Sequence, residues 1–162
     1  MHKLLLLTLM AAVWAMLVAL QVDEEMSIRT LFEAKRAVNR AAHAAAQQVD
    51  EDALAAGVVH IDEAAAASAA LRYLQTNLRL DSSLAPLPGS MLRDPVEIAE
   101  LRVVNGNEHF PYTYRNEVYD YEVTLRRPGV ILIVRVRYPR GFSVMDPIEW
   151  YVKGSAELVL PV

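Results

Sequence analysis

The sequence predicts an α+β fold, in which one long N-terminal helix and a second, short helix accompany an antiparallel four-stranded meander sheet. Residues 4–22 contain no charged side chain, and an amphipathic helical pattern continues from them to about residue 48 without Pro or Gly. After Pro95, apolar and polar residues alternate with the period of strands. We therefore divide the chain into an apolar helical segment (1–22), its amphipathic continuation (23–49) and a globular α+β domain (50–162).

The apolar segment is long enough to cross a membrane. As a helix, residues 4–22 would extend about 28 Å, close to the thickness of a bilayer core. His2 and Lys3 precede the segment and acids follow it, so we expect the N-terminus in the cytoplasm and the rest outside. A cleaved signal needs small residues at its cut site, and the one tolerable pattern, at residues 13–15, lies inside the run. An uncleaved anchor, and a helix that later leaves the membrane to pack in a filament, both remain open.

The continuation of this helix has an apolar and a charged face. Apolar residues recur at spacings of three, four or seven, so we expect them on one face of the helix: Ile28, Leu31, Phe32, Val38, Ala42 and Ala45. The opposite face is charged and expected to be solvated: Glu25, Arg29, Glu33, Arg36 and Arg40.

A second helix is predicted at residues 63–78. Gly57 can close the preceding turn in a left-handed conformation, and Asp62 is a suitable N-cap. The small and apolar residues of this segment recur at helical spacing, so the helix needs a partner surface along that side.

Four strands are predicted, at residues 96–106, 118–125, 130–138 and 148–160. The apolar parity shifts near Ala99 and again at Gly154, which predicts a β-bulge at each. Ile131 and Ile133 make one strand apolar on both faces, so another element should cover it.

Composition argues against several functions. The formal net charge is −4 and the pI is about 5.6, so no basic field is present to recruit nucleic acid. The absence of cysteine excludes thiol chemistry and thiolate metal sites. The histidines lie in contexts typical of solvated or structural residues, and no nucleophile motif or phosphate-binding loop is visible. We expect no enzyme, no metal site and no cofactor.

Three blocks resemble a known family. FEAKRAVNRAAHAAAQQVD continues the apolar helix, GVVHIDEAAAASAALRYLQTNL follows, and the tail contains VILIVRVRYP and KGSAELVLPV. This order resembles the TadE/TadG-like pseudopilins of tight-adherence pilus systems and, more broadly, type IV pilin-like proteins. Unlike most prepilins, the chain has no Gly before its apolar segment and no Glu within it.

The resemblance implies an exported, single-helix-anchored subunit whose partners are the membrane, the pilus assembly machinery and other copies of itself. We expect a structural subunit that polymerises into a filament on the cell surface; the alternative is an accessory pseudopilin that stays in the membrane. The expected self-assembly residues are Leu4, Leu5, Leu6, Leu7, Met10, Val13, Trp14, Leu17, Val18, Leu20, Ile28, Leu31 and Val38.

Burial of the N-terminus in a filament would require a counter-charge for Lys3 and the terminal amine. A neighbouring subunit shifted by about 30 Å, twenty helical residues, would bring acids to that position. The candidate acids are Asp23, Glu24 and Glu25.

Overall fold

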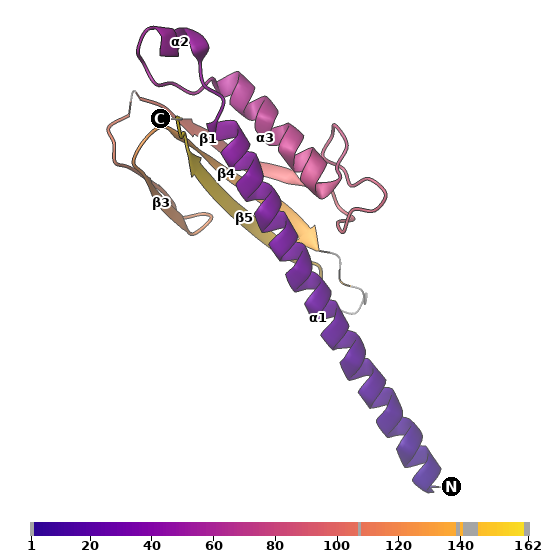
Figure 1. The fold of residues 1–162 in the computed structure, drawn as a ribbon. Helices are drawn as coiled ribbons and strands as arrows, with labels where there is room; N and C mark the ends of the chain where they lie inside the picture. The colour runs from indigo at the N-terminus through magenta and orange to yellow at the C-terminus, as the bar shows by residue number, and fades with distance from the viewer. Residues whose placement is uncertain (1, 107, 139, 141–145, 161–162) are drawn as a thin grey trace.

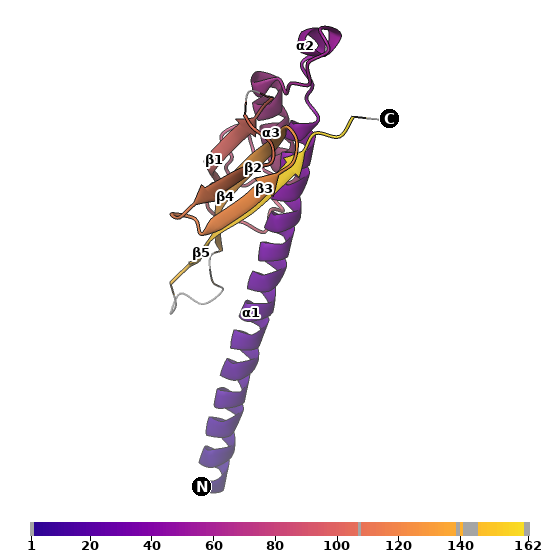
Figure 2. The same ribbon diagram turned by 90° about the vertical axis from the view of Figure 1, so that its left-hand side faces the viewer.

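The computed structural model describes residues 2–106, 108–138, 140 and 146–160. A long helix projects from a small α+β domain (Figures 1 and 2). The helices are α1 (His2–Ala46), α2 (Glu51–Ala55) and α3 (Glu63–Leu78); the strands are β1 (Glu97–Val104), β2 (Tyr112–Asn116), β3 (Tyr121–Leu125), β4 (Gly129–Tyr138) and β5 (Ile148–Glu157).

Helix α1 is continuous over 45 residues, so the predicted fusion of the apolar and amphipathic segments is confirmed. At 1.5 Å per residue it is about 67 Å long. It contains a stretch long and apolar enough to span a membrane, with a mean hydropathy of 2.3 and no part of it buried against the domain. Only the second half of the helix packs against the domain (Figure 1).

The predicted four-stranded meander is wrong. Strands β1, β4 and β5 form an antiparallel sheet in that order, and β2 and β3 form a separate two-stranded hairpin. The strand Tyr112–Asn116 was not foreseen, and residues 118–120, assigned to the next strand, lie in the turn of this hairpin. Because β3 pairs with β2, the chain must return to the sheet before β4 can pair with β1.

The hairpin covers one face of the sheet, and α1 and α3 pack on the other. Leu132 of β4 joins the core beneath α1 and α3. The adjacent residue, Ile131, lies instead in a cluster with Tyr114 and Leu125 of the hairpin. Ile131 and Ile133 are both fully buried, which confirms that a strand apolar on both faces has to be covered on both.

One of the two predicted bulges is present. The register of β1 against β4 shifts between Ile98 and Glu100, as the parity change at Ala99 predicted. At Gly154 the prediction is wrong, because β5 pairs with β4 without interruption. A Cβ at Gly154 would lie 2.9 Å from Val38 Cγ1 and 3.3 Å from the Val38 carbonyl oxygen. The glycine therefore allows α1 to approach the sheet closely.

We predict that Gly154→Ala destabilises the subunit by about 1–3 kcal/mol, because α1 must move to accommodate the methyl group. Thermal unfolding of the full chain in detergent measures the change. Gly106→Ala is the matched control, since its Cβ would meet only the Val59 carbonyl oxygen at 3.5 Å, an ordinary contact. Equal unfolding temperatures for the two variants would contradict the close-approach role.

Candidate functional site

The N-terminal half of α1 presents the largest apolar surface of the described chain. The expected self-assembly residues divide into three groups along it. Residues from Leu4 to Val18 in that set are exposed, and so is Ile28, whereas Leu20 and Leu31 are half-buried. Val38 is fully buried in the domain core, beneath the sheet contact at Gly154, so it is not available for contacts with another subunit.

An apolar stripe continues beyond the segment that would lie in lipid. We define the outer stripe as five exposed residues that recur at helical spacing: Met10, Trp14, Leu17, Ile28 and Phe32. Ile28 is 51% exposed and Phe32 58%, whereas Val38, expected on the same apolar face, is fully buried. The prediction of a single apolar face was therefore wrong at this point: among the buried residues of α1, the apolar ones begin only at Ala34. The spacing from Trp14 to Phe32 would have indicated the stripe.

The face that α1 turns toward the domain near residue 22 is polar. Asp23, Ser27 and Thr30 are all buried. The hydroxyl of Ser27 donates to the Glu24 carbonyl at 2.8 Å, and that of Thr30 donates to the Met26 carbonyl at 2.9 Å. Because the hydroxyls of Ser27 and Thr30 donate hydrogen bonds to carbonyls of their own helix, they can be buried without partners from the domain.

Asp23 fastens the helix to the end of the sheet. The hydroxyl of Tyr138, the last residue of β4, donates to Asp23 Oδ1 at 3.2 Å. Arg140 Nη1 lies 3.7 Å from Asp23 Oδ2 and donates to Glu24 Oε1 at 3.2 Å. Asp23 is 5% exposed and paired within its own subunit. We therefore exclude Asp23 as a counter-charge for a neighbour's Lys3. The sequence could not indicate this, because Tyr138 and Arg140 lie more than a hundred residues from Asp23.

Glu24 and Glu25 remain accessible. Their side chains are 59% and 61% exposed, even though Glu24 contacts Arg140 and Glu25 forms an ion pair with Arg29 at 2.5 Å. Exposed ion pairs of this kind exchange partners at little cost. Lys3, which is exposed, makes no ion pair within the described part of the chain.

Two buried tyrosines predict how stability depends on alkaline pH. Burial raises the pKa of Tyr138, and the charge of Asp23 raises it further; burial and a hydrogen bond to Glu100 raise the pKa of Tyr114. The folded state thus keeps these phenolic protons at pH values where the unfolded chain has lost them. Stability should be unaffected below about pH 9 and fall as the pH rises above about 10, the ordinary pKa of tyrosine.

Urea unfolding of the full chain in detergent between pH 8 and pH 11 measures this slope. The double variant with Tyr114→Phe and Tyr138→Phe should show a shallower alkaline decline, whereas Tyr73→Phe, at an exposed position, should match the unaltered protein. An unchanged slope in the double variant would show that other groups cause the decline.

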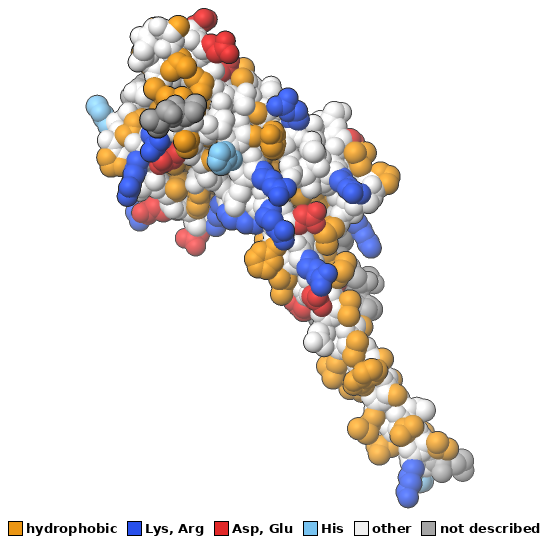
Figure 3. Space-filling model, viewed as in Figure 1, with side chains coloured by type: hydrophobic (Ala, Val, Ile, Leu, Met, Phe, Trp, Pro, Cys, Tyr) orange, Lys and Arg blue, Asp and Glu red, His pale blue; other side chains and the backbone are white. Residues whose placement is uncertain are grey.

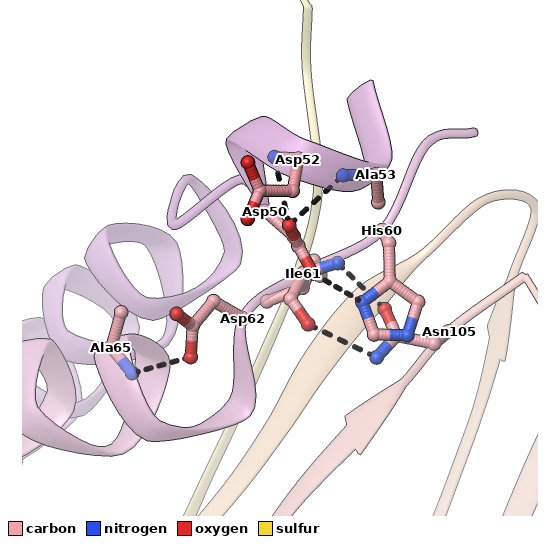
Figure 4. A network of polar contacts seen from close by, with 8 residues as sticks. All are labelled: Asp50, Asp52, Ala53, His60, Ile61, Asp62, Ala65 and Asn105. Atoms are coloured by element: carbon pink, nitrogen blue, oxygen red, sulfur yellow. Dashed lines mark hydrogen bonds and ion pairs between the residues drawn. The ribbon is translucent and has the colours of Figure 1, made fainter. Parts of the chain in front are cut away.

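The end of the domain farthest from the N-terminus is held by a polar network (Figure 4). Asp50 Oδ1 accepts from the amides of Asp52 and Ala53 at 3.0 Å and caps α2. Asp62 Oδ1 accepts from the Ala65 amide at 2.9 Å, which confirms it as the N-cap of α3. Both caps place carboxylates at helix N-termini, where they are favourable.

Asn105 connects this end to the sheet. It is buried at the end of β1, and its side-chain amide accepts from the Ile61 amide at 2.8 Å and donates to the Ile61 carbonyl at 3.1 Å. Asn105 therefore holds the segment between α2 and α3, together with the backbone hydrogen bonds from the Asp50 amide to the His60 carbonyl and from the Asp62 amide to the Gln48 carbonyl.

We predict that Asn105→Ala destabilises the subunit by about 1–3 kcal/mol, because it leaves the backbone amide and carbonyl of Ile61 buried without partners. Thermal unfolding in detergent gives the loss. Asn77→Ala is the control, since its hydrogen bonds to Arg40 and the Tyr73 carbonyl are exposed and should change stability by no more than about 0.5 kcal/mol. Similar losses in the two variants would refute the connecting role of Asn105.

Among the residues that the structure describes, no three His, Asp or Glu side chains come together in a way that could hold a metal ion. Comparison of the chain with protein-family models, with characterised proteins and with solved structures found no match.

Proposed function

We propose that the protein is a structural, pilin-like subunit that inserts in the membrane through the N-terminal part of α1 and then polymerises through the same helix into an extracellular filament. The observation that carries the proposal is the outer stripe, which continues past the segment that lipid would cover. The fused helix, the domain on its distal half and the resemblance to pilin-like proteins support the same function.

The dimensions of a bilayer distinguish this surface from a simple anchor. Phe32 lies ten helical residues beyond Val22, a rise of about 15 Å. The headgroup region of one leaflet is only about 5–8 Å thick. An upright or modestly tilted helix would therefore place Phe32 in water, where a large exposed apolar side chain is unfavourable unless another surface covers it.

Neighbouring copies of α1 are suitable to cover it. The members of the outer stripe are four, three, eleven and four residues apart, spacings close to one or three helical turns, so they share one side of α1 and can pack between parallel helices, although Gln21 interrupts the stripe between Leu17 and Ile28. In the membrane the first three residues of the stripe are already out of water, so their transfer to a filament gains mainly helix packing. Ile28 and Phe32 gain removal from water as well, which favours the assembled state over the inserted one.

We predict that Phe32→Ser strongly reduces filament yield and leaves membrane insertion and folding intact. Burial of roughly 100 Å² of the ring contributes about 2.5 kcal/mol per subunit, so the concentration needed for assembly should rise tenfold or more. Cells are sheared, and the chain is quantified in the sheared material and in the membrane fraction. Val118→Ser is the matched control, because Val118 is 84% exposed on the β2–β3 turn, away from α1.

The same fractionation tests the alternative. Recovery of the unaltered chain as a main component of sheared extracellular filaments supports a structural subunit. Retention in the membrane, with release only by detergent, would overturn the polymer and favour an accessory pseudopilin that stays in the bilayer. A chain that begins near residue 16–24 by N-terminal mass spectrometry would instead indicate a secreted domain released by signal cleavage.

A further inference from the structure

Charge is segregated along this chain. No Lys or Arg occurs between Arg40 and Arg72, whereas five carboxylates do: Asp50, Glu51, Asp52, Asp62 and Glu63. These acids gather around α2 and the start of α3, and Figure 3 shows acidic side chains at that end of the molecule. Lys and Arg side chains gather lower on the same face, over α1 and α3 (Figure 3).

The acidic end is rigid and exposed. Asp50 and Asp62 are engaged as helix caps. Glu51, Asp52 and Glu63, which we call the acidic tip, are exposed and make no ion pair with any residue that the structure describes. Because the caps and Asn105 fix the backbone, these carboxylates are presented without an ordering cost for the chain that carries them.

A groove of about 530 Å³ lies between α1 and the C-terminal end of α3. Its lining contains three arginines and one acid, Arg29, Arg36, Arg40 and Glu33, and we call it the arginine groove after this excess of arginine. Arg40 Nη1 donates to the neutral Asn77 Oδ1 at 2.8 Å, and Arg36 Nε donates to the Phe32 carbonyl at 3.4 Å. Within the described residues, neither guanidinium has a carboxylate partner.

We propose that the arginine groove of one subunit binds the acidic tip of a second copy of this chain, displaced along the filament axis. The inference rests on the proposed function and deepens it by naming the contact between the globular domains. Charge complementarity carries the proposal. Within the described residues, the guanidinium groups of Arg36 and Arg40 have no carboxylate partner, and the three carboxylates of the acidic tip have no cationic partner.

The geometry is compatible with parallel packing of α1. Arg36 lies ten residues before Ala46, a rise of about 15 Å, and α2 lies beyond the end of α1 in both ribbon views (Figures 1 and 2). A stagger slightly greater than 15 Å would place one subunit's tip beside the next subunit's groove. Two different surfaces meet in such a contact, so it repeats without closing and generates a filament.

Lipid headgroups fit the groove less well. Arg36 lies 14 helical residues beyond Val22, about 21 Å above the end of the apolar segment and outside a headgroup layer of about 5–8 Å. Phe32, which also lines the groove, links it to the outer stripe, so one contact between copies would cover both surfaces.

Charge exchange tests the contact. Arg36→Glu with Arg40→Glu, and separately Glu51→Arg with Glu63→Arg, should each reduce sheared filaments at least tenfold. The chain with all four substitutions should recover to within about threefold of the unaltered protein, a recovery that a folding defect would not give. Arg126→Glu, at an exposed position just after β3, is the control and should assemble normally, because the Arg126 side chain makes no ion pair within the described residues.

A cross-link gives an independent readout, because the chain has no cysteine of its own. Arg40→Cys with Glu51→Cys should form a ladder of disulfide-linked oligomers from filaments under oxidising conditions. The two positions are too far apart along the helix axis to join within one subunit, since Arg40 lies about 9 Å below Ala46 and a disulfide needs Cα atoms within about 7 Å.

Normal filaments from either charge-reversed variant, or filaments of the cysteine variant that give no ladder, would overturn this contact and leave the proposed function standing. Absence of filaments from the unaltered chain would overturn the proposed function and the contact together.

Discussion

The close contact between α1 and the β4–β5 sheet is the interaction on which the rest of the molecule depends. Alanines at positions 34, 37, 41 and 42 and the missing side chain at Gly154 let the helix lie directly on the strands. Since the same helix extends to His2, this contact also fixes the domain relative to the apolar N-terminal half of the helix. Because α1 is unbroken between its apolar half and the domain, a force on either part is transmitted to the other.

The unbroken connection between the apolar half of α1 and the domain explains why the helix has two different faces near residue 22. A helix that passes from lipid into a domain must present a surface suited to each environment along a single axis. Here the side facing the domain carries Asp23 and self-satisfied hydroxyls, and the apolar side faces outward. The arrangement is the reverse of an ordinary amphipathic helix, which buries its apolar side in its own domain. An outward apolar face beyond the bilayer is best explained by neighbours of the same kind.

The features of the fold that could be predicted from the sequence are those determined by residues close together in the chain. The continuous helix, the Asp62 cap and the bulge at Ala99 were predictable because each is recorded in adjacent residues. The separate hairpin was missed because pairing is decided by the partner strand, and Ile131 needed a cover that periodicity could not identify.

In the site, the expected residues from Leu4 to Val18 are exposed, whereas Val38 of the same set is buried in the domain core, so a single apolar face does not continue beyond residue 22. Asp23 is held on the inward face by Tyr138 and Arg140, which are distant in sequence, whereas Ser27 and Thr30 are buried there with hydrogen bonds to their own helix. Periodicity shows which apolar residues share a face of a helix, but not whether the chain's own domain or another molecule covers that face.

In the proposed filament, the outer stripe and the charged surfaces would have different physical roles. Apolar contact along α1 is non-directional, so it favours packing of helices without fixing their axial offset. Ion pairs between the arginine groove and the acidic tip contribute little free energy each, but they are satisfied at one stagger and penalise others by juxtaposing like charges. These separate roles require a rigid connection between α1 and the domain. A charge contact at the domain can set the axial offset of the apolar segment only if the domain and the segment move together.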